Sequence, residues 1–310
     1  MKRINIIMLL AFCITFTQCK PIDETNTEIR YVGVSSINNS KTDVSPEGIV
    51  TWSSNDFICG YGLDSDMFAK LVQIPISSIT DEGKVAHFDY TYQNSGPIGL
   101  GGVPLCKDLY HIKNITNYNY QLDGQNYSMT TIAANVMDQT GKKEDVGNYL
   151  VAHSKVTFEN VSETTSLPKL YFECNFKPLS SVARVNLEGA KQVLVNYSGL
   201  NNVFYVERST PPNCTNKYEE CDMLGGGEIY PQEERGITIT SPSADTYITL
   251  LPQETPVETV VEFTDPSTGE VLGSVTFPNG IKSGKLYAGP NFQPIELKPG
   301  NRNTIVETEL

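Results

Sequence analysis

The chain has 310 residues, enough for two domains of ordinary size that each bury a core. Its formal net charge is −13 at pH 7, and no cluster of lysine or arginine interrupts the acidic excess. Because such a chain repels phosphate backbones, we predict no nucleic-acid partner.

The first eighteen residues have the pattern of an export signal. Lys2 and Arg3 precede a mostly apolar stretch over residues 4–16, and polar residues follow. The stretch is too short to span a bilayer comfortably, and no later run reaches spanning length. We therefore predict that residues 1–18 are a cleaved signal peptide. Its removal leaves 21 basic against 36 acidic side chains, a net charge of −15.

Cys19 stands directly after this segment, at the position where bacterial lipoproteins are acylated. We predict that it carries lipid such as palmitate and holds the protein to a membrane. Phe16 and Gln18 replace the usual residues of a lipobox, so simple secretion and a structural thiol remain the alternatives. Residues 19–30 are polar and include Pro21, which predicts a lipid-attached tether.

Five cysteines remain beyond the signal peptide and Cys19, and an odd number cannot all pair. Cys214 and Cys221 flank the short polar loop TNKYEE and are the predicted disulfide, since export permits oxidation. For the other three cysteines, Cys59, Cys106 and Cys174, a buried free thiol is expected at least as much as a disulfide.

The rest of the chain has the pattern of an all-β fold. Turn residues recur every eight to twelve positions between short runs rich in Val, Ile, Thr, Tyr and Phe. Residues 257–277 predict a hairpin turned by DPSTG, and residues 182–187 and 191–199 predict a second pair of strands. The side chains expected on the packed face of the first hairpin are Val257, Thr259, Val261, Phe263, Val271, Val275 and Phe277.

A change of composition divides the chain. Between residues 158 and 170 the alternation is lost and Ser, Thr, Glu and Pro accumulate, as in a linker. We therefore predict an N-terminal β-sandwich over residues 31–164 and a C-terminal β-sandwich over residues 165–310.

The chain contains the segments TWSSNDFICGYG, LYFECNFKPLSSVARVNL, SADTYITLLPQETP and GSVTFPNGIKSGKLYAGPNF. These four segments resemble elements of the fimbrillin family, the fimbrial subunits and accessory lipoproteins of anaerobic Gram-negative bacteria. TWSSNDFICGYG at residues 51–62 is similar to an element near the start of mature fimbrillins, with Asn55 and Cys59 in place of Gly. LYFECNFKPLSSVARVNL is similar to the segment that opens the second domain. The strongest resemblances are SADTYITLLPQETP and GSVTFPNGIKSGKLYAGPNF.

The resemblance implies two transthyretin-like β-sandwich domains in tandem. It implies a fimbrial (pilus) structural or accessory subunit that is exposed on the cell outer membrane and supports cell adhesion. It also implies assembly by strand exchange, in which a protease removes the first strand and a strand from another fimbrial subunit fills the groove. The strand to be removed would lie within residues 28–44, with Ile29, Tyr31 and Gly33 on one face and Arg30, Val32 and Val34 on the other.

The resemblance also implies a cleavage position after the first strand and a segment that donates the replacement strand. Cleavage is expected after Lys41; Arg30 is the other basic candidate, but a cut there would leave the groove filled. Residues 292–310 could donate the incoming strand or form an ordinary last strand with a frayed tail. The candidate plugs are Ile295, Leu297, Ile305 and Leu310.

No pattern indicates an enzyme, a metal site or a cofactor. The chain has no G-x-S-x-G or H-E-x-x-H motif, and His87, His111 and His153 lack ligand spacing, so solvated or strand-packed roles are expected. The alternative function is a stand-alone surface lipoprotein that binds glycan or a host ligand. Its contact residues would be tyrosines in residues 110–127, although cross-strand packing is their more ordinary role.

Overall fold

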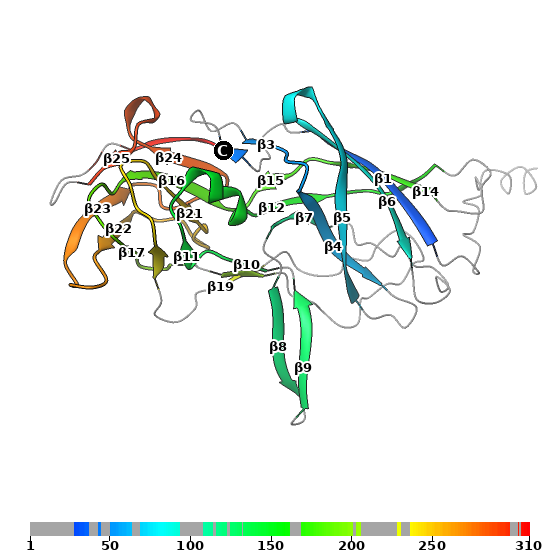
Figure 1. The fold of residues 1–310 in the computed structure, drawn as a ribbon, viewed down its shortest axis with the longest axis horizontal. Coiled ribbons are helices and arrows are strands. Elements are labelled where there is room, and N and C mark those ends of the chain that lie inside the picture. The colour runs from blue at the N-terminus through cyan, green and yellow to red at the C-terminus, as the bar shows by residue number, and fades with distance from the viewer. Residues whose placement is uncertain are drawn as a thin grey trace, which may run out of the picture.

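The computed structural model confirms the predicted all-β class. Among the described residues the chain forms strands and three short helices, and no helix has the length and apolar character needed to cross a membrane. In Figure 1 the strands gather into two packed bodies. The structure describes residues 28–36, 43–44, 50–63, 69–93, 108–113, 116–122, 125–131, 133–161, 169–200, 203–205, 228–230, 236–297, 303 and 305–310.

The first body is built on a nine-stranded sheet of order β13-β14-β1-β6-β5-β4-β7-β12-β15. All neighbours are antiparallel except β1 and β14. The strands are β1 (Glu28–Ser36), β4 (Phe57–Leu63), β5 (Ala69–Thr80), β6 (Val85–Gln93), β7 (Asp108–His111), β12 (Ala152–Lys155), β13 (Glu159–Asn160), β14 (Lys169–Cys174) and β15 (Lys177–Pro178).

Strand β5 turns the corner of this sheet. Residues 69–75 pair with β4, residues 76 and 78–80 pair with β6, and the register with β6 shifts between Ile76 and Ser78, next to the change of partner. A long strand that changes partner at a bulge lets a sheet fold over its own core. The turn from β5 to β6 contains η1 (Asp81–Gly83), and two short strands, β2 (Asp43–Val44) and β3 (Val50–Thr51), pair with each other.

The second body is a sandwich of two sheets. One has the order β11-β20-β17-β22-β23 and the other β21-β16-β24-β26, with β25 also paired to β16. The strands are β11 (Asp138–Gln139), β16 (Ser181–Asn186), β17 (Val193–Asn196), β20 (Ile237–Ile239), β21 (Thr246–Leu250), β22 (Thr259–Thr264), β23 (Val271–Phe277), β24 (Lys285–Ala288), β25 (Ile295–Glu296) and β26 (Val306–Glu309); η2 (Lys143–Asn148) and η3 (Pro290–Phe292) lie outside the sheets.

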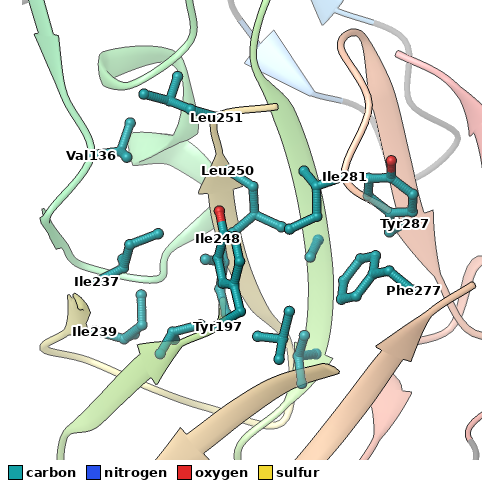
Figure 2. Close-up of a cluster of buried hydrophobic side chains, with 14 of the residues drawn as sticks. Val136, Tyr197, Ile237, Ile239, Ile248, Leu250, Leu251, Phe277, Ile281 and Tyr287 are labelled. Carbon is teal, nitrogen blue, oxygen red and sulfur yellow. The ribbon is translucent and has the colours of Figure 1, made fainter. Parts of the chain in front are cut away.

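Apolar side chains from both sheets meet between them. Tyr197 and Ile239 project from one side, and Ile248, Leu250 and Tyr287 project from the other (Figure 2). This core also includes Cys59 and Tyr110 of the first body. Their chain neighbours Ile58 and Leu109 belong to a separate hydrophobic core, that of the first body, which is called the first core below. The two hydrophobic cores therefore lie on opposite faces of β4 and β7.

The predicted pairing of residues 182–187 with residues 191–199 is wrong. Strands β16 and β17 lie in opposite sheets, where β16 pairs with β21, β24 and β25, and β17 pairs with β20 and β22. The intervening turn, with Gly189 at φ +86°, carries the chain across the sandwich. Alternation indicates which side chains are buried, but it does not indicate which strand is the neighbour.

The predicted hairpin at residues 257–277 is confirmed as β22 and β23. Val257 and Val271 are wrongly placed, because each is more than half exposed: Val257 precedes β22, and a bulge after Phe263 shifts the register at Val271. The inward side chains that the sequence predicted correctly are Thr259, Val261, Phe263, Val275 and Phe277.

The predicted boundary near residue 165 lies outside the described residues. Strands β14 and β15 follow it in sequence and pair within the first sheet. Between the bodies, β10 (Ala133–Asn135), β18 (Val203–Tyr205) and β19 (Glu228–Tyr230) form a small sheet. A hairpin of β8 (Thr116–Leu122) and β9 (Gln125–Thr131) extends away from the bodies in Figure 1.

Candidate functional site

The candidate site is the place that β1 occupies in the nine-stranded sheet. Strand β1 pairs antiparallel with β6 from Glu28 opposite Gln93 to Ser36 opposite Val85. On its other side it pairs in parallel with β14, so strands from distant parts of the chain flank it. Without β1, two unpaired strand edges would face each other across a gap one strand wide.

The side chains of β1 alternate as the sequence predicted. Ile29 and Tyr31 are fully buried on the inward face, together with Gly33, whereas Arg30 is half-buried on the other face. The ring of Tyr31 meets the ring of Phe158 edge-on, with their centroids 5.6 Å apart. One face of β1 therefore completes the first core.

Gly33 lies beneath two aromatic rings. Its partner on β6 is Phe88, and its partner on β14 is Phe172. The two rings stack above it with centroids 5.9 Å apart, and a Cβ atom at Gly33 would lie 2.3 Å from Phe172 Cζ. A glycine inside a strand commonly marks such a close approach, which is the sequence signal that points to these two residues.

An ion pair holds the outer face of β1. Arg30 donates to Asp89 of β6, with Nε 2.7 Å from Oδ1 and Nη2 2.5 Å from Oδ2. The hydrogen bond from Arg30 lowers the pKa of Asp89 below its ordinary value. Both side chains are more than 40% exposed, so the pair contributes little to stability and more to the choice of partner.

Two basic residues were predicted as processing positions. Arg30 lies in an interior strand of the sheet, whose main chain is paired on both sides. Proteases cut where the backbone is exposed and unpaired, so the β-paired main chain shields Arg30 while β1 is in place. Lys41 lies outside the described residues.

Trp52, the only tryptophan, lies in the wall next to the β1 site. Its ring is buried and meets three other rings edge-on, those of Phe88, His111 and Phe176, at centroid distances of 6.2, 5.0 and 5.9 Å. The family-like element at residues 51–62 therefore contributes to the core that β1 completes.

A buried polar cluster follows Trp52. The carboxylate of Asp56 is buried, accepts a hydrogen bond from the Ser53 N–H at 2.7 Å, and forms a 3.0 Å ion pair with Lys113. Burial lowers the pKa of His111 to about 4, while the charge of Asp56 opposes this shift and that of Lys113 adds to it. His111 is therefore a neutral, packed residue at pH 7.

The remaining predicted site residues divide between described and undescribed parts of the chain. Cys19, Cys214 and Cys221 lie outside the described residues. Cys59 and Cys174 are buried free thiols, and burial raises the pKa of both. Among the described residues, no group of three His, Cys, Asp or Glu side chains could hold a metal ion.

The two other histidines have nearby polar partners. His153 pairs with Asp108 at 2.7 Å, and His87 lies 3.0 Å from the hydroxyl of Thr80. Both belong to strands of the first sheet, as a strand-packed role predicts.

The predicted donor segment at the C-terminus is bound within its own body. Strand β25 pairs with β16, and β26 pairs with β24. Ile295 and Leu310 are buried, while Leu297 and Ile305 are partly buried against the second core. Residues 295–297 and 305–310 therefore complete the second sandwich in this structure.

The tyrosines predicted for ligand binding occupy two environments. Tyr110 is buried, and its ring lies 6.0 Å from that of Phe204. Strands β8 and β9 place Tyr120 opposite Tyr127 and Tyr118 opposite Met129 in the projecting hairpin.

The solved structures that match this chain include cell adhesion and fimbrial proteins. A candidate cell adhesion protein from Bacteroides uniformis is 12% identical with a TM-score of 0.43, covering 92% of this chain and 98% of that one. The C-terminally truncated tip fimbrial protein Mfa3 from Porphyromonas gingivalis is 10% identical with a TM-score of 0.36, covering 91% and 100%. The fimbrial anchor protein Mfa2 from the same organism is 10% identical with a TM-score of 0.30, covering 91% and 98%.

No family model matches the sequence, and neither does any curated protein.

Proposed function

We propose that this protein is a fimbrial structural or accessory subunit that exchanges β1 for a strand of another subunit and thereby supports cell adhesion. The position of β1 carries the proposal. It is the first described strand of the chain, yet it lies inside the sheet with a paired strand on each side. Cleavage of one connection, between β1 and β2, would separate it covalently from the rest of the fold.

The vacated site would bind a new strand strongly. Main-chain groups of β6 and β14 would lose their partners, and the pockets of Ile29 and Tyr31 would open to water. Burying an apolar side chain of this size contributes about 1.5–3 kcal/mol, and each restored hydrogen bond adds about 1 kcal/mol. An incoming strand that restores both would be held tightly, which is the basis of a stable fibre.

The finer features of the proposal come from the sequence. The two bodies correspond to tandem transthyretin-like sandwiches, lipid at Cys19 anchors the precursor in the outer membrane, and cleavage follows Lys41. That cut lies beyond the end of β1 at Ser36, so it releases the whole strand, whereas a cut at Arg30 leaves most of the strand in place.

The proposal is tested on the native surface protein. N-terminal sequencing is expected to give a start after Lys41, and gels run without boiling are expected to show a ladder of oligomers. A Lys41→Gln variant should lose both, while Lys84→Gln, which changes an exposed lysine, should keep both. A surface protein that keeps residues 28–36 and stays monomeric would overturn the proposal.

The projecting hairpin of β8 and β9 favours a second candidate, a stand-alone surface lipoprotein that binds glycan or a host ligand. The hairpin extends from the bodies in Figure 1, and its register places Tyr120 opposite Tyr127 and Tyr118 opposite Met129. Stacking on tyrosine is a common way to bind sugars. Glycan-array binding that is lost when these tyrosines become serine, by a protein that never oligomerises, would favour this function.

A further inference from the structure

We infer that the strand which replaces β1 comes from a different subunit, not from the C-terminal segment of a second copy of this chain, and carries the pattern basic–aromatic–any–glycine. The inference rests on the proposed strand exchange. It assigns the chemistry of the partner from the residues that surround Arg30, Tyr31 and Gly33.

The glycine requirement comes from Phe88 and Phe172. Both rings are buried and stack on each other, and the ring of Phe172 lies directly over Gly33. Phe172 also meets Phe158 edge-on at 5.7 Å, and Phe88 meets Trp52 at 6.2 Å, so neither ring can turn away without disturbing a packed neighbour. A donor residue with a side chain at this position would collide with the ring of Phe172.

The positions on either side of the glycine also select by size. Two residues before it, the fully buried Tyr31 fills a pocket beside Phe158, which calls for a large aromatic side chain. Two residues after it, Ser35 is fully buried between Ala86 and Cys174, which calls for a small one.

The basic requirement comes from Asp89. Its carboxylate accepts two hydrogen bonds from Arg30, and Lys169 of β14 is the other charged group that lowers its pKa. When β1 leaves, Asp89 loses its principal partner. A lysine or arginine at the position of Arg30 restores the pair, whereas an acidic residue would bring like charges together.

The C-terminal segment of this chain does not meet these requirements. With Ile295 and Leu297 in the positions of Ile29 and Tyr31, Glu296 falls beside Asp89. The next inward position, that of Gly33, then receives Pro299, which has a ring and no N–H to donate.

The last residues fit no better. With Ile305 at the position of Ile29, Glu307 enters the pocket of Tyr31. With Val306 there instead, Leu310 falls under the two phenylalanine rings. A second copy therefore offers no C-terminal strand that satisfies the aromatic, basic and glycine positions together.

The test uses the full mature chain with a specific protease site placed in residues 38–41, so that β1 can be cut loose but initially stays bound. Fluorescent peptides are then added in excess, and their incorporation is followed by anisotropy. The peptides are residues 27–37, the same peptide with Gly33→Val, the same peptide with Arg30→Glu, and residues 292–310. Because only the peptides vary, the folding of the receiving chain is the same in every arm.

Peptide 27–37 is expected to replace β1. The Gly33→Val peptide should bind about 5- to 150-fold more weakly, which is the loss of affinity that overpacking of this kind causes. The Arg30→Glu peptide should bind more weakly than peptide 27–37, most clearly at low salt, and peptide 292–310 should not enter. Equal incorporation of all four would overturn the inference while leaving strand exchange intact. Failure of every peptide, peptide 27–37 included, would overturn strand exchange itself and the inference with it.

Discussion

The side-chain amide of Gln139 forms two hydrogen bonds with the main chain of Thr249, as a neighbouring β-strand would. Gln139 Nε2 donates to the Thr249 carbonyl at 2.8 Å, and the Thr249 N–H donates to Gln139 Oε1 at 2.9 Å. Nε2 also donates to the carbonyl of Val136 at 2.9 Å, while the main chain of β11 pairs with β20 in the opposite sheet. One residue therefore links the two sheets of the second sandwich along one side.

Replacing Gln139 with leucine is expected to lower the free energy of unfolding by about 2–4 kcal/mol, because buried main-chain groups lose their partners. Urea denaturation measures the change. Gln73→Leu, at an exposed position of β5, is the matched control and should stay within about 0.5 kcal/mol of the wild type. Equal stability of the two variants would contradict the assigned role of Gln139.

The buried carboxylate of Asp56 depends on Lys113. Lys113→Met is expected to cost about 3 kcal/mol of unfolding free energy, because it leaves a fully buried charge without its cation. Adding Asp56→Asn to Lys113→Met should recover part of that loss, since the amide carries no charge. A double-mutant cycle measures this coupling, and strictly additive losses would contradict it.

His111 predicts a particular dependence of stability on pH. Burial lowers its pKa from 6.5 to about 4 in the folded protein, so the unfolded chain takes up the proton first. Stability should therefore fall as the pH drops from about 6.5 through about 4, by up to about 3 kcal/mol, and this contribution should change no further below that range.

Urea denaturation at pH 7.0 and at pH 4.5 tests this dependence. The difference between the two pH values should shrink in His111→Leu. Ile112→Val, a core change beside it, should lower stability about equally at both values. An unchanged difference in His111→Leu would show that another group is responsible.

Leu310 is expected to stabilise the second body. Leu310 is buried in a small cluster with Val146, Leu150 and Leu286, and its N–H donates to the Gly284 carbonyl at 2.8 Å. Leu310→Ala is expected to cost about 2–4 kcal/mol in thermal or urea unfolding.

A frayed tail would show no such loss. Glu309→Gln serves as the control, because Glu309 is largely exposed in its ion pair with Lys285 and should cost no more than about 1 kcal/mol.

The sequence predicted burial better than it predicted pairing. The alternation in β1 and in the hairpin of β22 and β23 placed most inward side chains correctly, because a period of two follows directly from strand geometry. The assumed pairing of β16 with β17 failed, since two strands close in sequence can lie in opposite sheets of a sandwich. Pairing depends on long-range contacts, which local alternation does not encode.

The same division applies to the candidate site. The faces of β1 were predictable, and so was a close approach at Gly33. The parallel pairing of β1 with β14 was not predictable, because nothing in residues 28–36 indicates residues 169–174 as their neighbours. Outside the site, the role of Gln139 was not predictable either, because apolar alternation gives no signal for a buried glutamine that bonds to main-chain groups.

The parallel pairing of β1 with β14 has a consequence for how the molecule is made. The ribosome produces β1 early, but one of its sides stays open until Lys169 and the residues after it have been synthesised. Contacts between such distant segments form slowly, and an unsatisfied strand is prone to bind the wrong neighbour in the meantime. Residues 28–36 are therefore a segment that a chaperone would have to shield until residues 169–174 are available to pair with them.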